Sequence, residues 1–327
     1  MEDKDFPEGE KIIDSFTDDR QSATYLLNQA QYALESNNYS YALKLLSKAK
    51  AKRRPIQGND YLRAICFFRM SQPYAAKEAL LEELRYFPNH QEAKNLLSQI
   101  LTQYPQMVAG QIANKEFQEI FHLIRPFTML SEERLYSIFS LTKRVCIENI
   151  MGNFVECGVA AGGSTVLLAY IIKKYSKNSR YLYAFDSFEG MPEPTEYDKH
   201  NGQDAETIGW GTGTCAAPEA VVRELCVKFN VSDIVRTVRG YFNKTLPKML
   251  TTIGPIAFLH MDGDWYESTK TILDNLYELI VYNGIVQVDD YGYWEGCKRA
   301  IREFEAQRNI KFEINNIDDT GIWFSKT

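Results

Sequence analysis

Short apolar runs alternate with helical patterns after Gly152. Each apolar run has the length of a strand, and the stretches between the runs repeat apolar residues at the spacing of an amphipathic helix. Such alternation is typical of a doubly wound, mostly parallel sheet in an α/β protein. We therefore predict strands over residues 154–159, 181–185, 234–238, 256–261 and 284–288, with helices over residues 165–175, 218–229, 266–282 and 295–307.

The end of the chain carries two more apolar runs, over residues 312–317 and 321–325. Only a few residues join them, so we predict an antiparallel hairpin at the edge of the sheet. The pair Asn283-Gly284 is expected to end the helix that precedes the strand over 284–288.

The first part of the chain is helical in pattern from Ser22 to about Ile100. Small and apolar positions recur with an offset of 34 residues, since Ala42 aligns with Ala76 and Leu46 with Leu80. This all-α region resembles tetratricopeptide repeats. The resemblance predicts a surface that docks a protein partner. The alternative is a helical appendage that packs on its own catalytic domain or on a second copy of the chain.

These patterns divide the chain into four parts. We predict a disordered polar tail over residues 1–20, a tetratricopeptide-like domain over 21–105, a helical lid or linker over 106–150 and the α/β domain over 151–327. Within the linker, Ser131 is expected to cap a helix.

Composition narrows the class of protein. The chain has 327 residues, of which 45% are hydrophobic and 24% charged, as in soluble globular proteins. The net charge of −6, without a basic block, speaks against a nucleic-acid partner. No apolar run approaches the roughly 20 residues of a membrane helix, and the acidic N-terminus is not a signal peptide. Six cysteines without a CxxC pair are typical of a reduced, cytoplasmic protein.

A glycine-rich turn follows the first predicted strand in VECGVAAGGST. Glycines let the backbone approach a ligand, and the following helix offers free N–H groups. The spacing is not the GxGxxG of dinucleotide-binding enzymes, which disfavours a dehydrogenase. Glu156 is a carboxylate in an apolar strand, where we expect it to hold an amine or hydroxyl of a ligand or else to be an edge-facing charge. The candidate cofactor-binding residues of this segment are Glu156, Gly158, Gly162, Gly163 and Ser164.

The second predicted strand ends at Asp186, followed by Ser187. An acid at this point commonly accepts hydrogen bonds from ribose hydroxyls. Together with the glycine turn, Asp186 and Ser187 predict a nucleoside-containing cofactor, which fits S-adenosylmethionine as well as NAD.

Three carboxylates follow the next two strands: Asp262 after residues 256–261, and Asp289 with Asp290 after residues 284–288. Ligands bind at the carboxyl ends of the strands in open α/β sheets. Three carboxylates repel each other unless a cation lies among them, and oxygen ligands suit Mg²⁺. Asp264 shares the first turn and is expected to cap the helix from Tyr266 or to support the cation ligands.

From about residue 125 to 325 the chain resembles the macrocin O-methyltransferase family. Five segments agree in order: ECGVAAGGS, DSFEGMP, GYFNKTLP, MDGDWYEST and DDYGYWEGCKRAI. The resemblance implies a seven-stranded class I methyltransferase fold, S-adenosylmethionine, Mg²⁺ held by Asp262, Asp289 and Asp290, and methylation of a hydroxyl. Two features depart from the family: the added helical region, and Ala160-Ala161 where a bulkier pair is expected.

Methyl transfer from a sulfonium needs an aligned oxygen that is at least partly deprotonated. A metal ion lowers the pKa of a hydroxyl, and a neighbouring carboxylate can accept its proton. Asp262 is the first candidate for this base. His260 on the same strand and His200 in the long loop after the second strand are the other catalytic candidates, although both fit a structural role.

The leading hypothesis is therefore a magnesium-dependent O-methyltransferase that acts on a small hydroxylated molecule, of sugar or polyketide type. The alternative is a non-catalytic scaffold that recruits a partner through the tetratricopeptide-like region. The added helices also make a homo-oligomer possible.

Overall fold

The computed structural model describes residues 23–50, 55–104, 112 and 114–327, so the predicted tail over residues 1–20 lies outside it. The described residues form two compact units. The helical unit contains the described residues before 108 together with Glu206–Thr214, and the α/β unit contains the rest. The helices that follow residue 114 therefore belong to the same unit as the sheet.

The helical unit consists of consecutive helices joined by short turns. Residues 23–35 are helical. They are followed by α2 (Tyr39–Lys50), α3 (Asn59–Arg69), α4 (Pro73–Tyr86) and α5 (Gln91–Gln103). The aligned positions Ala42, Leu46, Ala76 and Leu80 are all fully buried in one hydrophobic cluster. The repeat in the sequence therefore corresponds to a repeat in packing, and the resemblance to tetratricopeptide repeats stays a prediction.

A buried carboxylate from α4 holds the start of α3. Glu83 accepts hydrogen bonds from the backbone N–H groups of Gly58 at 2.7 Å, Asp60 at 3.2 Å and Tyr61 at 3.3 Å. Its Oε1 also lies 2.7 Å from Nδ1 of His90, which precedes α5. The first N–H groups of a helix have no partner within the helix, so this carboxylate satisfies them and ties three helices together.

The α/β unit is built on a seven-stranded sheet with the order β5-β2-β1-β6-β7-β9-β8. The five strands from β5 to β7 are parallel, β9 runs antiparallel to β7, and β8 runs antiparallel to β9. The predicted doubly wound sheet and its edge hairpin are therefore confirmed. The strands are β1 (Asn153–Cys157), β2 (Leu182–Asp186), β5 (Val235–Arg239), β6 (Ile256–Met261), β7 (Ile280–Val288), β8 (Asn315–Asn316) and β9 (Ile322–Ser325).

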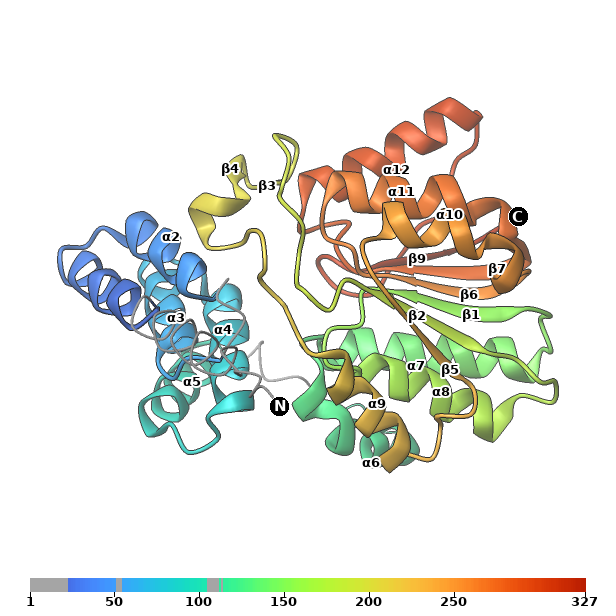
Figure 1. Cartoon of the computed structure of the whole chain (residues 1–327), viewed down its shortest axis with the longest axis horizontal. Coiled ribbons are helices and arrows are strands. Elements are labelled where there is room, and N and C mark those ends of the chain that lie inside the picture. The colour runs from blue at the N-terminus through green and yellow to red at the C-terminus, as the bar shows by residue number, and fades with distance from the viewer. Residues whose placement is uncertain (1–22, 51–54, 105–111, 113) are drawn as a thin grey trace, which may run out of the picture. The chain divides into compact units, whose positions relative to one another are not determined.

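Helices cover both faces of this sheet (Figure 1). One face carries α6 (Lys115–Ile124), α7 (Glu132–Ile147), α8 (Gly163–Tyr175) and α9 (Glu219–Lys228), and the other carries α10 (Phe242–Ile253), α11 (Tyr266–Leu276) and α12 (Glu295–Arg308). The predicted cap of α7 is confirmed, because the Ser131 side chain accepts a hydrogen bond from the backbone of Arg134 at 3.2 Å. Across the described part of the chain, no helix has the length and apolar character needed to cross a membrane.

The predicted helix over residues 266–282 is too long. The α-helix α11 ends at Leu276, a 3₁₀ turn follows over Tyr277–Leu279, and β7 begins at Ile280. Asn283-Gly284 thus lies inside a strand and does not cap a helix. The pairing between β6 and β7 shifts register here, and Asn283 has φ +63°, so the Asn-Gly pair forms an irregularity in the strand. Helix α10 was not predicted, although its apolar residues Phe242, Leu246, Leu250 and Ile253 recur at helical spacing; the helix contains Pro247.

Candidate active site

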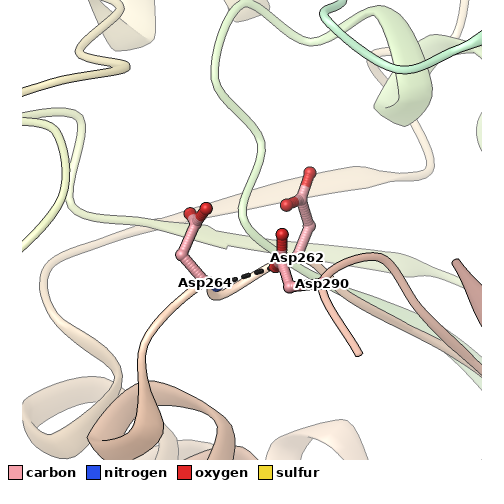
Figure 2. A group of neighbouring side chains, drawn as sticks. All are labelled: Asp262, Asp264 and Asp290. Atoms are coloured by element: carbon pink, nitrogen blue, oxygen red, sulfur yellow. Dashed lines mark hydrogen bonds between the residues drawn. The ribbon is translucent and has the colours of Figure 1, made fainter. Parts of the chain in front are cut away.

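Three aspartates come together at the carboxyl ends of β6 and β7 (Figure 2). Asp262, Asp264 and Asp290 each offer one carboxylate oxygen, and these oxygens lie within 4.8 Å of one another. The backbone N–H of Asp264 donates to Oδ2 of Asp290 at 2.9 Å. Oxygens bound to one Mg²⁺ or Ca²⁺ at about 2.0–2.6 Å are at most about 5 Å apart. The three carboxylates therefore fit a hard divalent cation.

The electrostatics of this cluster also favour a cation. Burial, and after it the neighbouring carboxylates, raise the pKa of Asp262 and of Asp290 well above the usual range. Burial likewise raises the pKa of Asp264, to about 7, although a hydrogen bond from the Trp294 indole acts to lower it. Arg134 opposes these shifts only in part. A divalent cation would stabilise the ionised forms of all three carboxyls.

Asp264 does not cap α11, which was one of the two roles predicted for it. The helix begins after Trp265 without a side-chain cap, and the first backbone N–H, from Tyr266, donates to Asp198 at 2.6 Å. The Asp264 carboxylate instead accepts a hydrogen bond from Nε1 of Trp294 at 3.1 Å. Its φ of +56° turns the backbone toward the cluster, a conformation that costs energy for a residue other than glycine.

Asp289, the third predicted cation ligand, lies outside the group of three. Its Oδ2 forms an ion pair with the Arg134 guanidinium, and among the described residues its Oδ1 has no hydrogen-bond partner. Arg134 also donates to Asp318 at 2.9 Å and to the Thr320 hydroxyl. Although burial lowers the pKa of Arg134, Asp289 and Asp318 raise it above its usual value, so it stays charged. Arg134 belongs to the site, and no local pattern in the sequence marks it.

The glycine turn lies directly against the acid cluster. Gly158 has φ +97°, and a Cβ atom added to it would lie 1.9 Å from the backbone oxygen of Asp262. A Cβ on Gly163 would lie 2.8 Å from the backbone oxygen of Phe127. Gly162 has φ +90° and precedes α8. Backbone conformation therefore favours glycine at 158 and 162, and the close approach of neighbouring backbone requires glycine at 158 and 163.

Asp186 holds the same turn from the second strand. Its Oδ2 accepts hydrogen bonds from the backbone N–H groups of Val159 at 2.8 Å and Ala160 at 3.0 Å. Burial raises the pKa of Asp186, and these backbone donors partly offset the shift. The hydroxyl of Ser187 donates to the carbonyl of Gly190 at 2.7 Å. The other oxygen of Asp186, Oδ1, accepts from the backbone N–H of Phe188 at 2.6 Å. The structure therefore places Asp186 at the glycine turn, and its role in binding a cofactor stays a prediction.

Glu156 and His260 form a buried pair inside the sheet. Both are fully buried on paired positions of β1 and β6, and Oε1 of Glu156 lies 3.2 Å from Nδ1 of His260. Oε2 of Glu156 accepts a hydrogen bond from the Thr165 hydroxyl of α8. Gln287 continues this polar row on β7. Glu156 is not the edge-facing charge of the alternative, because β1 lies in the middle of the sheet and its side chain is fully buried. The structure places neither Glu156 nor His260 in the acid cluster, and their roles in ligand binding and catalysis stay predictions.

His200 lies in a short hairpin formed by β3 (Lys199–His200) and β4 (Gln203–Asp204), which the sequence did not predict. Its ring stacks on Tyr293, with centroids 4.1 Å apart, and its Nδ1 lies 2.9 Å from the Tyr293 carbonyl oxygen. A nitrogen beside a carbonyl donates to it, and Nε2 of His200 lies 3.0 Å from Nδ2 of Asn201, from which it can accept. Trp294, which binds Asp264, lies beside the His200 ring at 6.3 Å between centroids.

A mostly parallel sheet whose last strands reverse, with a glycine turn after β1 and acids after β2, β6 and β7, defines the class I S-adenosylmethionine-dependent methyltransferases. The family model for macrocin-O-methyltransferase (TylF) matches residues 76–326. The chain belongs to this family and is an S-adenosylmethionine-dependent O-methyltransferase.

Named relatives support the assignment. The demethyldecarbamoylnovobiocin O-methyltransferase of Streptomyces niveus is 34% identical over 201 residues, which cover 61% of this chain and 76% of the relative. A tetracenomycin-C 4'-O-methyltransferase of Streptomyces olivaceus, which acts on a rhamnosyl derivative by its name, is 32% identical with the same coverage. The solved structure of the O-methyltransferase NovP is 34% identical, covers 62% of this chain and 82% of its own, and has a TM-score of 0.56.

Proposed function

We propose that this enzyme methylates a hydroxyl of a small natural-product intermediate, of sugar or polyketide type, and that it requires Mg²⁺. The observation that carries the proposal is the acid cluster of Asp262, Asp264 and Asp290, packed against the glycine turn at Gly158. The relatives named for novobiocin, tetracenomycin and mycinamicin derivatives support the substrate class.

S-adenosylmethionine would bind over the glycine turn. Gly158, Gly162 and Gly163 shape this turn, because neighbouring protein atoms occupy the positions that their Cβ atoms would take. Ser164 lies in the first turn of α8, where backbone N–H groups have no partner within the helix. Asp186 and Ser187 at the end of β2 would bind its ribose. Glu156 is proposed to support the turn indirectly, through its hydrogen bond from Thr165.

Asp262, Asp264 and Asp290 would hold the cation, and Arg134 would keep Asp289 beside it as a further negative charge. A bound magnesium ion supplies Lewis acidity, which lowers the pKa of the substrate hydroxyl. Asp262 would accept the hydroxyl proton. His200 is the second candidate base, because its ring lies next to the aromatic residues that border the cluster. Its Nε2, which lies 3.0 Å from the amide nitrogen of Asn201, would have to exchange that partner for the substrate hydroxyl.

Calorimetric titration tests this function. We expect S-adenosylmethionine to bind the protein, and Mg²⁺ to bind at a single site. The scaffold alternative predicts neither event. If the folded protein binds neither the cofactor nor the cation, the proposed function is wrong.

The affinity for Mg²⁺ should rise with pH. The cation binds ionised carboxylates, so it must displace protons from groups whose pKa is raised in the cation-free protein. Since the pKa of Asp264 lies at about 7, this residue alone would weaken binding about tenfold between pH 8 and pH 6. Calorimetry in buffers of different ionisation enthalpy would measure both the affinity and the protons released. An affinity that is independent of pH over this range would contradict the assigned ligands.

The same shifts predict how stability changes with pH when no cation is bound. The folded protein binds more protons at these carboxyls than the unfolded chain does, so its free energy of unfolding falls as pH rises from about 4 toward 7. Mg²⁺ should oppose this fall, because it binds the folded state only. Urea unfolding at pH 5.5 and pH 8, with and without Mg²⁺, would show the effect.

A further inference from the structure

The segment Glu206–Thr214 belongs to the helical unit, although the chain on both sides of it belongs to the α/β unit. It lies in the middle of the 32 residues, 187 to 218, that connect β2 to α9. Connections from a strand to the next helix in α/β units usually have about 2–6 residues, so this one is unusually long, even though it contains the short strands β3 and β4. The helical unit therefore contains a piece of the loop that follows the second strand of the sheet.

The backbone of Gly209 is bound by two side chains of the helical unit. Its carbonyl oxygen accepts a hydrogen bond from the Ser47 hydroxyl on α2 at 2.6 Å and from Nη2 of Arg63 on α3 at 3.2 Å. The Arg63 guanidinium also lies over the Trp210 ring, 4.9 Å from its centroid. A hydrogen bond from a charged donor together with a cation–π contact makes this a specific attachment.

The attachment site is built into the helices. Arg63 is only 1% exposed, and its Nη1 pairs with Asp60 at 2.7 Å. Burial raises the pKa of Asp60, but Lys50 and Arg63 outweigh it and hold the pKa below its usual value. Gly209 has φ +90°, and a Cβ atom on it would lie 3.2 Å from the Leu43 side chain. Burying an arginine is costly unless its donors are satisfied, and here the Gly209 carbonyl satisfies one of them.

The preceding part of the same loop lies beside the acid cluster. Trp265, which follows Asp264, donates through Nε1 to the carbonyl of Pro192 at 3.0 Å. Asp198 accepts from the backbone of Tyr266 at 2.6 Å, and the ring of His200 stacks on Tyr293. Residues 192–205 therefore border the site in the α/β unit, and residues 206–214 are held in the helical unit.

We propose that the α2–α3 surface is an internal receptor for residues 206–214, and that its role is to hold residues 192–205 in place beside the acid cluster. Fixing the middle of a long loop divides it into two short spans, which reduces the conformations open to each. The helical unit thus positions the loop that carries His200, and its α2–α3 surface is occupied by this chain. The attachment of residues 206–214 stands independently, whereas the view that residues 192–205 border a site of methyl transfer rests on the proposed function.

Hydrogen–deuterium exchange of the full-length protein tests the receptor. Arg63→Met removes the donor to Gly209 and the contact with Trp210. We expect amide exchange to become at least tenfold faster over residues 206–214, and also faster over residues 197–205. Arg69→Met is the matched control, because Arg69 is exposed on the same helix, and it should leave both peptides unchanged.

A variant in the loop distinguishes release of the loop from unfolding of the helical unit. If Arg63→Met speeds exchange throughout α2–α5, Trp210→Ala decides, since it leaves the helices intact and should release the same peptides. Unchanged exchange over residues 206–214 in Trp210→Ala would overturn the receptor. Release of 206–214 with full protection of 197–205 would overturn the positioning role. Titration with S-adenosylmethionine separates the two proposals, because its affinity should be unchanged in both variants.

Discussion

Asp262→Asn should abolish methyl transfer while the affinity for S-adenosylmethionine is retained. The substitution keeps the shape of the side chain but removes a carboxylate that we propose as both cation ligand and proton acceptor. Loss of a general base alone typically costs about 10²–10⁴-fold in rate, and loss of the Lewis acid adds to this. The glycine turn and Asp186 are unchanged, so the cofactor should still bind.

Three measurements on Asp262→Asn separate these roles. Transfer of a labelled methyl group to a panel of hydroxylated sugars and polyketides reports turnover, and calorimetry reports the affinities for Mg²⁺ and for the cofactor. Asp274→Asn is the matched control, because Asp274 is exposed on α11, away from the acid cluster, and its carboxylate pairs with Lys270 one turn earlier. Near-normal turnover in Asp262→Asn would exclude Asp262 as ligand and base. If turnover is lost but the affinity for Mg²⁺ is retained, Asp262 is the base and not a cation ligand.

Gly158→Ala should destabilise the α/β unit and weaken both ligand sites together. The new methyl group would lie 1.9 Å from the backbone oxygen of Asp262, at a residue with φ +97°. Backbone cannot give way as a flexible side chain can, so either β1 or the turn after β6 must move. We expect a loss of about 3 kcal/mol or more in the free energy of unfolding, from overpacking combined with backbone strain.

Gly202→Ala is the control for backbone strain. Gly202 also has a positive φ, +75°, but nothing lies within 4 Å of the position that its Cβ would take. This variant should lose only about 1 kcal/mol. Urea unfolding gives the stability of each variant, and calorimetry gives the affinities for S-adenosylmethionine and Mg²⁺. If the two alanine variants are equally stable, the close approach of Gly158 to Asp262 does not matter.

Local patterns were sufficient for the order of strands and helices. Residues 154–159, 256–261 and 284–288 are apolar and of strand length, because strands buried under helices on both faces have little polar character. The same order of elements placed the glycine turn and Asp262 together at the carboxyl ends of the parallel strands. The Asn283-Gly284 pair misled the prediction, because the same residue types serve a helix end and an irregular strand, and only pairing with β6 decides between them.

The choice among neighbouring acids could not be read from the sequence. Asp289 and Asp290 are adjacent and chemically equal, yet one pairs with Arg134 and the other joins Asp262 and Asp264. Arg134 is 155 positions away from Asp289 along the chain. Likewise, Glu156 stands out as a charge in an apolar strand, but its partners on α8 and β6 appear only when the strands are paired.

The sequence by itself determined the alternation of strands and helices, the glycine turn, the acids at the strand ends and the repeat in the first hundred residues. Each of these depends on residues close together in the chain, whose spacing follows the period of a helix or strand. The tertiary structure decided which acids meet, which carboxylates lie against Arg134 or His260, and where residues 206–214 bind. These outcomes depend on contacts between distant segments, because the energy of a buried charge is set by the groups that surround it in space.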